Sequence, residues 1–182
     1  MEVWKEFEAN QLTHSAAHYL VAVHDILSER GYARSADVAK KLGIARSSAS
    51  LGLKALIEKN YLKEDENKFI QITSQGQRLA EEIIGKKLVL KRFFQDILKV
   101  KPYQAEVDCC KIEHLISSET GSSLLHFIHF MSSEDAEIKK ILEKFWKSKE
   151  ASHACPGLSR CNICETACIK EQIPSKLRVI EK

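Results

Sequence analysis

The stretch SADVAKKLGIARSSASLGLKALIEKN, residues 35–60, predicts two short helices joined by a tight turn. Ser35 stands where an N-cap residue is expected, and Gly43 stands where the first helix should end. The second helix opens at Arg46, with small polar residues in its first turns. This arrangement is typical of a helix-turn-helix DNA-binding motif, for which a plain helical hairpin is the structural alternative.

The side chains expected to contact DNA lie mostly in the second of these helices. Short or basic hydrogen-bond donors gather near its N-terminus, where the helix dipole also favours phosphate. These candidates are Arg46, Ser47, Ser48, Ser50 and Lys54.

A short β-hairpin is predicted after the second helix. The segment YLKEDENKFIQIT, residues 61–73, alternates apolar and polar residues on either side of a polar turn. A hairpin in this position makes the module a winged helix, and Lys68 is its expected phosphate contact.

Residues 12–30 predict a helix before this motif, with Thr13 as N-cap and Gly31 as stop. One face of this helix is apolar. His14, His18 and Asp25 fall on the opposite face at about 100° per residue. This second face is either a solvated surface or the lining of a site shared with another element.

Helices are also predicted after the wing, and they are too apolar for a monomeric surface. The expected ranges are 74–100, about 103–116, 119–131 and 134–149. A helical dimerisation region is the natural use, because paired winged helices read two half-sites. The expected fold is therefore mainly α: a winged helix-turn-helix with a two-stranded wing, a helical dimerisation domain and a short Cys-rich segment. The expected domain ranges are 1–75, 76–150 and 151–182.

Composition limits the class of protein. The 182 residues are 44% hydrophobic, enough to bury a core, and the net charge is +3. Between residues 31 and 101, fifteen Lys and Arg stand against eight Asp and Glu, which points to a polyanionic partner. No apolar stretch of membrane-spanning length and no signal-peptide pattern is seen, so we expect a cytoplasmic protein without a membrane partner.

A candidate metal site lies in DCCKIEH, residues 108–114. Cys110, Glu113 and His114 are spaced i, i+3 and i+4 and would project from one helical face. Thiolate, carboxylate and imidazole together suit a borderline cation such as Fe²⁺, Zn²⁺, Co²⁺ or Ni²⁺. An ordinary helix surface is the alternative. Cys109 points about 100° away and is expected to be a small core residue.

Four further cysteines crowd into CPGLSRCNICETAC near the C-terminus: Cys155, Cys161, Cys164 and Cys168. In a reducing compartment, such a cluster indicates a metal or redox site and not disulfides. Structural zinc usually uses two CxxC pairs, and only one is present, so the spacing favours a [4Fe–4S] cluster, with Zn²⁺ and plain thiols as alternatives.

Residues 12–131 resemble the diphtheria-toxin-repressor and manganese-transport-regulator family of metal-dependent repressors. The resemblance rests on HYLVAVHDILSERGYARSADVAKKLGIARSSAS, YLKEDENKFIQITSQG and DCCKIEHLIS. It implies a winged helix, a helical dimer interface and a metal site between them that controls operator binding. The ligand positions implied by the resemblance fall on His18, Cys110, Glu113 and His114.

Three positions depart from the family pattern. Val21 replaces a carboxylate, Lys87 replaces a histidine and Lys91 stands where another carboxylate ligand is expected. We therefore do not expect a second, ancillary ion, because the ammonium of Lys87 places a positive charge there instead. We do not expect the family's optional C-terminal β-barrel, because the cysteine segment stands in its place.

The sequence thus predicts a homodimeric, metal-responsive transcription repressor that binds a double-stranded DNA operator. Fe²⁺ is the favoured ion, with Mn²⁺, Zn²⁺, Co²⁺ and Ni²⁺ possible. The alternative is a protein-interaction module that links a cysteine-bound cluster to iron transport or cluster assembly without sequence-specific DNA binding. We do not expect an enzyme, because no nucleophile–base pair, phosphate loop or pair of acids is seen.

Overall fold

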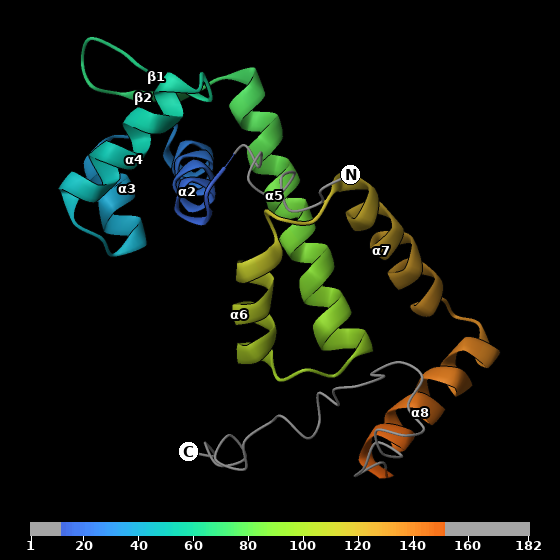
Figure 1. Cartoon of the computed structure of the whole chain (residues 1–182). Helices are drawn as coiled ribbons and strands as arrows, with labels where there is room; N and C mark the ends of the chain where they lie inside the picture. Colours follow the sequence, from blue (N-terminus) through green and yellow to red (C-terminus); the bar gives the residue numbers. More distant parts are fainter. Residues whose placement is uncertain (1–11, 152–182) are drawn as a thin grey trace, which may run out of the picture. The chain divides into compact units, whose positions relative to one another are not determined.

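The computed structural model describes residues 12–151, which are mainly helical with one two-stranded hairpin (Figure 1). Residue contacts divide the chain into two compact units, of which the first ends at Ser132 and the second begins at Ser133. The first unit holds helices α2 (His14–Arg30), α3 (Ser35–Leu42), α4 (Arg46–Glu58), α5 (Ser74–Arg92), α6 (Pro102–Ile112) and α7 (Ser118–Met131), and strands β1 (Leu62–Glu64) and β2 (Ile70–Ile72). The second holds α8 (Ala136–Ala151).

The winged helix-turn-helix is confirmed, and so are the predicted ends of its first helix. The Thr13 hydroxyl accepts a hydrogen bond from the Ala16 N–H at 3.3 Å, as an N-cap does. Gly31 follows the helix in the left-handed region at φ 79°, and its N–H donates to the carbonyl of Leu27. Gly43 ends α3 in the same way, at φ 64°.

The prediction that Ser35 caps α3 is wrong. The helix begins at Ser35 after an extended Arg34, and the backbone N–H of Arg34 donates to the Asp37 carboxylate at 3.0 Å. The Ser35 hydroxyl instead lies 2.9 Å from the Ser50 hydroxyl on α4. The carboxylate of Asp37 therefore stabilises the start of α3, and Ser35 links the two helices of the motif.

The predicted wing is an antiparallel pair in which Leu62 faces Ile72 and Glu64 faces Ile70. One carboxylate oxygen of Asp65 accepts the backbone N–H groups of Asn67 and Phe69, both at 2.9 Å, and this holds the turn. The hairpin therefore lies where the alternating sequence predicted it, with the apolar side chains of Leu62 and Ile70 buried.

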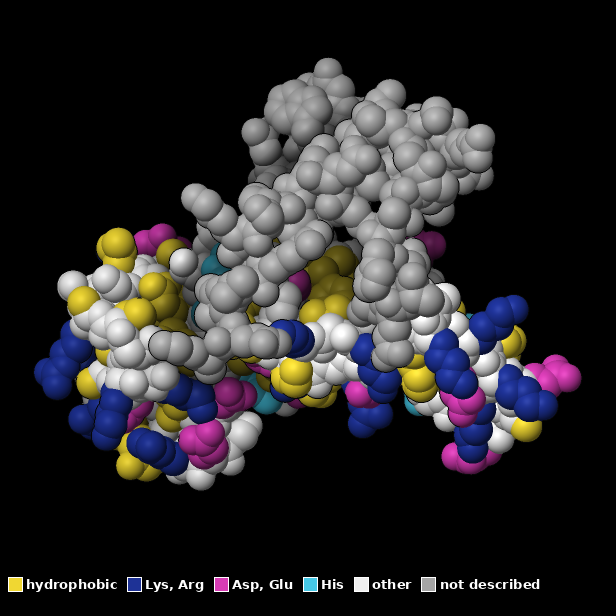
Figure 2. Space-filling view, turned by 90° about the horizontal axis from the view of Figure 1, so that it is seen from below, with side chains coloured by type: hydrophobic (Ala, Val, Ile, Leu, Met, Phe, Trp, Pro, Cys, Tyr) yellow, Lys and Arg dark blue, Asp and Glu magenta, His cyan; other side chains and the backbone are white. Residues whose placement is uncertain are grey.

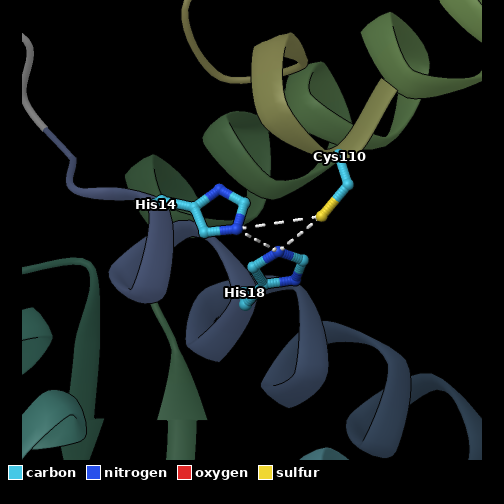
Figure 3. A group of neighbouring side chains, drawn as sticks. All are labelled: His14, His18 and Cys110. Atoms are coloured by element: carbon cyan, nitrogen blue, oxygen red, sulfur yellow. Dashed lines mark hydrogen bonds between the residues drawn. The ribbon is translucent and has the colours of Figure 1, made fainter. Parts of the chain in front are cut away.

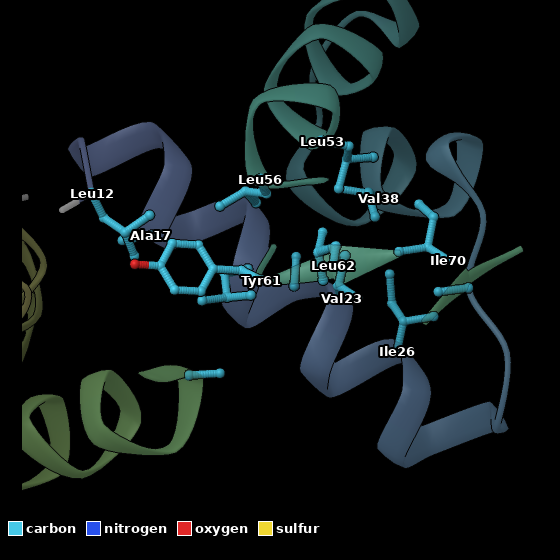
Figure 4. Close-up of a cluster of buried hydrophobic side chains, with 14 of the residues drawn as sticks. Leu12, Ala17, Val23, Ile26, Val38, Leu53, Leu56, Tyr61, Leu62 and Ile70 are labelled. Atoms are coloured by element: carbon cyan, nitrogen blue, oxygen red, sulfur yellow. The ribbon is translucent and has the colours of Figure 1, made fainter. Parts of the chain in front are cut away.

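The core of the winged helix forms where α2, α3, α4 and the hairpin meet (Figure 4). Leu20 and Val23 of α2 and Leu56 of α4 are fully buried there. The first residues of α5 close the same core through Ala80 and Ile83. Because α5 continues beyond this core and packs against α6 and α7, it joins the winged helix to the helices that follow.

The first two helices after the wing are shorter than the sequence predicted, whereas α7 and α8 lie within two residues of their predicted bounds. The expected helix over 74–100 ends at Arg92 and is followed by a π-helical turn, η1 (Phe93–Ile97). The expected helix over 103–116 begins at Pro102 and ends at Ile112. Glu113, the residue after α6, keeps helical backbone angles, and its N–H donates to the carbonyl of Cys109.

In the second unit, α8 buries Ile138 and Leu142 and leaves Ile141 and Phe145 exposed. No helix in the described range 12–151 is both long and apolar enough to cross a membrane.

Candidate metal centre and nucleic-acid interface

Two helices bring three metal-binding side chains together in the first unit. His14 and His18 on α2 point toward Cys110 on α6 (Figure 3). His18 Nε2 lies 3.2 Å from Cys110 Sγ and 3.2 Å from His14 Nε2, and Cys110 Sγ lies 3.8 Å from His14 Nε2. Among the described residues, these three form the one group of His, Cys, Asp and Glu whose ligand atoms all lie within 4.8 Å of one another.

The local sequence explains this geometry. His14 and His18 are one turn apart on α2, so they share the face opposite the apolar stripe. Cys109 is completely buried, as predicted, and the next residue on α6 is therefore turned about 100° away from that core. Cys110 faces α2 for this reason.

Glu113 and His114, the other two expected ligands, do not belong to this group. Glu113 is only 4% exposed, and its Oε2 atom lies 3.8 Å from Lys87 Nζ with no hydrogen bond. The His114 ring lies 5.0 Å from the His14 ring, measured between centroids. Both residues come after the last residue of α6, Ile112, and both remain next to the group.

Two lysines of α5 lie near two carboxylates, Glu106 on α6 and Glu113 just after it. Lys87 Nζ lies 2.8 Å from Glu106 as well as near Glu113, and Lys91 Nζ lies 3.1 Å from the other oxygen of Glu106. Glu106 is a partner that the sequence did not single out. Positive charge supplied by the chain is therefore already present where the family resemblance implied further ligands.

The pKa values of His18, Cys110 and Glu113 are shifted in the direction that favours their neutral forms. Burial, with His14 next in effect, lowers the pKa of His18, and burial together with the Glu113 charge raises the pKa of the Cys110 thiol. Burial also raises the pKa of Glu113, although Lys87 opposes this shift. Without an ion, the imidazole and the thiol are thus neutral near pH 7. Metal binding would require the thiol to lose its proton.

Imidazole nitrogen and thiolate sulfur fit a borderline divalent cation such as Fe²⁺, Co²⁺, Ni²⁺ or Zn²⁺. Their donor atoms already lie within a few ångström of a common point, and they come from two different helices. The arrangement can therefore bind one ion and, by doing so, hold α2 against α6.

Five of the six expected DNA contacts lie on α4, and the sixth, Lys68, lies between strands β1 and β2. Arg46, Ser47 and Ser48 are exposed, whereas Ala49 and Leu53 are buried and hold the helix in the core. Figure 2 shows several Lys and Arg side chains at the side of the first unit that carries α3 and α4. An open groove between α4 and the wing is lined in part by Arg34, Ser35, Ser50, Lys54 and Lys68. Lys68 also contacts Glu64 at 3.2 Å.

The four-cysteine segment, Cys155 to Cys168, lies outside the described residues.

Two protein-family models match this chain. A family model described as the N-terminal DNA-binding domain of iron-dependent repressors matches residues 11–69. A second, described as the metal-binding and dimerisation domain of iron-dependent repressors, matches residues 73–143. The chain belongs to the iron-dependent repressor family. This family consists of metal-dependent, DNA-binding transcriptional regulators and not of enzymes.

Individual relatives of this family member are distant. The HTH-type transcriptional regulator MntR of Bacillus subtilis (strain 168) is 25% identical over 138 residues, which cover 76% of this chain and 96% of that protein. Among solved structures, T. acidophilum IdeR has a TM-score of 0.53 at 19% identity, covering 62% of this chain and 53% of that one. The structure of the manganese regulator SloR has a TM-score of 0.57 at 22% identity, and the match covers 63% of this chain and 54% of that one. The chain thus spans about half of each structure, and this likeness concerns the fold.

Proposed function

We propose that this family member is an iron-responsive transcription repressor that binds a double-stranded DNA operator as a homodimer in the cytoplasm. The observation that carries the proposal is the 3.2 Å approach of His18 Nε2 to Cys110 Sγ. His18 belongs to the helix that forms the core of the DNA-binding domain, and Cys110 belongs to the matched metal-binding and dimerisation domain. A metal-dependent change at this contact would therefore act on both domains.

His18 and Cys110 would hold the ion, with Glu113 and His114 beside them on the α6 side to complete the ligand set. The buried Glu113 Oε2 atom, which has no hydrogen bond, supports its place in this set. When bound, the ion supplies coordination bonds between α2 and α6. Closing this contact favours one arrangement of the winged helix over others, which is how ion binding selects a DNA-binding state.

The dimer is supported by exposed apolar side chains in the matched dimerisation domain. Leu125, Phe127 and Phe130 of α7 are each exposed by 41% or more, and Leu115 before α7 is exposed by 38%. Large apolar side chains gathered on one helix are typical of a protein interface. A dimer would place two copies of α4 on successive half-sites, where Arg46, Ser47, Ser48, Ser50, Lys54 and Lys68 would contact DNA.

We further propose that Cys155, Cys161, Cys164 and Cys168 hold a [4Fe–4S] cluster, with Zn²⁺ as the alternative. Protein purified without oxygen should then be brown, with visible absorbance that oxygen bleaches. A colourless protein with one bound zinc per chain would reject the cluster and leave the repressor proposal intact.

The test of the repressor is selection of genomic DNA fragments by full-length protein purified without oxygen, with and without Fe²⁺. We expect a small set of fragments to be enriched only in one of the two conditions, and mass measurement in solution to give a dimer. Fragments bound without preference in both conditions would contradict the proposal. Capture of a cluster-assembly or transport protein in the absence of nucleic acid would then favour the interaction module.

A further inference from the structure

His14 is the one member of the three-residue group that neither the sequence motifs nor the family resemblance assigned to the metal. It is the first residue of α2 and is exposed. An exposed histidine at a helix start is free to extend into solvent, yet this ring faces inward. It lies edge-on to the His18 ring at a centroid distance of 4.5 Å, and its Nε2 atom points at the same place as His18 Nε2 (Figure 3).

Hydrogen bonds among three neutral groups account for at most two of these three contacts at once. His18 Nε2 lies 3.2 Å from both His14 Nε2 and Cys110 Sγ, whereas a neutral imidazole nitrogen is either one donor or one acceptor. If both rings carry their proton on Nδ1, two acceptors face each other and only the single thiol proton lies between them. A cation at this place would satisfy both nitrogens and the sulfur at once.

The spacing of the three atoms matches the edges of a tetrahedron around such a cation. Bonds of about 2.0–2.1 Å to nitrogen and about 2.3 Å to sulfur, at tetrahedral angles, separate two nitrogens by about 3.3 Å and nitrogen from sulfur by about 3.6 Å. The observed separations are 3.2 Å between the nitrogens, and 3.2 and 3.8 Å from nitrogen to sulfur. Small movements of three side chains would therefore suffice.

We infer that His14 is a direct metal ligand, and that His14, His18 and Cys110 form a nitrogen–sulfur core. This core favours Fe²⁺, Co²⁺, Ni²⁺ or Zn²⁺ over Mn²⁺. This inference rests on the proposed function, since it concerns the same site. Manganese prefers oxygen ligands and stands lowest in the general order of divalent affinities. Of the proposed ligands only Glu113 offers an oxygen, and it lies outside the core and beside Lys87, so the three core donors include no oxygen.

Cobalt is a suitable probe, because its absorption reports sulfur ligation and tetrahedral geometry directly. The experiment uses the full chain with the four tail cysteines changed to serine, so that Cys110 and the buried Cys109 are the remaining thiols. We expect one Co²⁺ per chain, a sulfur-to-cobalt charge-transfer band and intense visible bands. An about hundredfold excess of Mn²⁺ should leave these bands in place, whereas Zn²⁺ should abolish them.

His14→Ala and His14→Gln, made in the same background, test the new ligand. Each should weaken Co²⁺ binding by at least about tenfold, since even loss of outer-shell support costs that much, and each should reduce the visible bands. His126→Ala is the matched control, because this histidine is exposed on α7, outside the group. Unchanged affinity and spectrum in both His14 variants would overturn the inference, as would ready displacement of Co²⁺ by Mn²⁺.

The titration contains no DNA, so it separates the two proposals. If the His14 variants keep the Co²⁺ affinity and spectrum while DNA binding depends on metal, the ligand assignment is wrong and the repressor proposal holds. If the cobalt spectrum depends on His14 but the protein prefers no DNA fragment, the ligand assignment holds and the repressor proposal is wrong. Absence of any cobalt spectrum would overturn both.

Discussion

The sulfur of Cys110 lies 3.2 Å from Nε2 of His18, a contact between residues 92 positions apart in the sequence. One residue belongs to a helix of the DNA-binding domain, and the other belongs to the matched metal-binding and dimerisation domain. The contact is formed by side chains that are half-buried and chemically suited to a borderline cation. Control of DNA binding by metal would follow from closing or opening this one contact.

Removing either partner should abolish stabilisation by metal. In the variant without tail cysteines, Co²⁺ at about 100 times its dissociation constant should raise the free energy of unfolding by about 2.7 kcal/mol. His18→Ala and Cys110→Ser should each lose most of this increase, because each removes a proposed ligand. Denaturant unfolding with and without Co²⁺ measures the effect. Full retention of the increase in both variants would contradict a site at this contact.

Lys87 should stabilise the fold by neutralising Glu113. Lys87→Met leaves a buried carboxylate without its nearest positive charge, and we expect a loss of about 1–3 kcal/mol at pH 7, less than for a fully buried pair because Lys87 is partly exposed. Adding Glu113→Gln should restore at least about 1 kcal/mol, as expected for coupled residues. Lys91→Met is the control. It breaks only a more exposed pair with Glu106 and should cost at most about 1 kcal/mol. Equal losses for the two lysines would contradict this role.

Local patterns predicted the winged helix well because its elements have strong end signals. Thr13 and Gly31 mark the start and the end of α2, as expected. The Thr13 hydroxyl and the left-handed Gly31 each make hydrogen bonds within one turn of the helix, so local sequence is enough to predict them. Ser35 was misassigned because the preference for serine at the N-cap takes no account of neighbouring side chains. The Asp37 carboxylate accepts the backbone N–H of Arg34, and the Ser35 hydroxyl contacts Ser50 on the next helix.

Two features of the candidate group were not predicted from the sequence. Helical spacing placed Cys110, Glu113 and His114 on one face, but it does not include Lys87 of α5, beside which the buried Glu113 lies. His14 was not assigned to the metal site because it precedes the motif that carries the family resemblance. The signal was nevertheless present, since His14 and His18 share one helical face. Only the packing of α2 against α6 reveals that this face meets a thiol.

The role of α4 in DNA binding is tested by removing single charges. Arg46→Ala and Lys54→Ala should each weaken binding to a selected fragment, and each should lower the slope of log affinity against log salt concentration by about 1 if it removes a phosphate contact. Lys111→Ala is the control, because Lys111 is exposed on α6 and pairs with Asp108. Fluorescence anisotropy at several salt concentrations gives the slopes. If the unmodified protein and the three variants gave the same salt-dependence slope, α4 would not be the phosphate-binding helix.

Two glycines of α5 should respond in opposite ways to alanine. A Cβ atom at Gly76 would lie 2.0 Å from the backbone oxygen of Tyr61, whereas a Cβ atom at Gly85 meets nothing within 4 Å. Gly76→Ala should therefore destabilise the fold by about 1–3 kcal/mol through overpacking. Gly85→Ala should stabilise it by about 0.5–1 kcal/mol, because alanine favours a helix interior. Thermal or denaturant unfolding measures both, and a stable Gly76→Ala variant would show that α5 does not pack against Tyr61 this closely.

Anomalous X-ray scattering at the cobalt edge, from crystals of the variant without tail cysteines grown with Co²⁺, tests the central claim most directly. We predict one peak per chain at about 2.0–2.3 Å from both His18 Nε2 and Cys110 Sγ. A cobalt peak elsewhere, with His18 and Cys110 still in contact with each other and not with the ion, would contradict it.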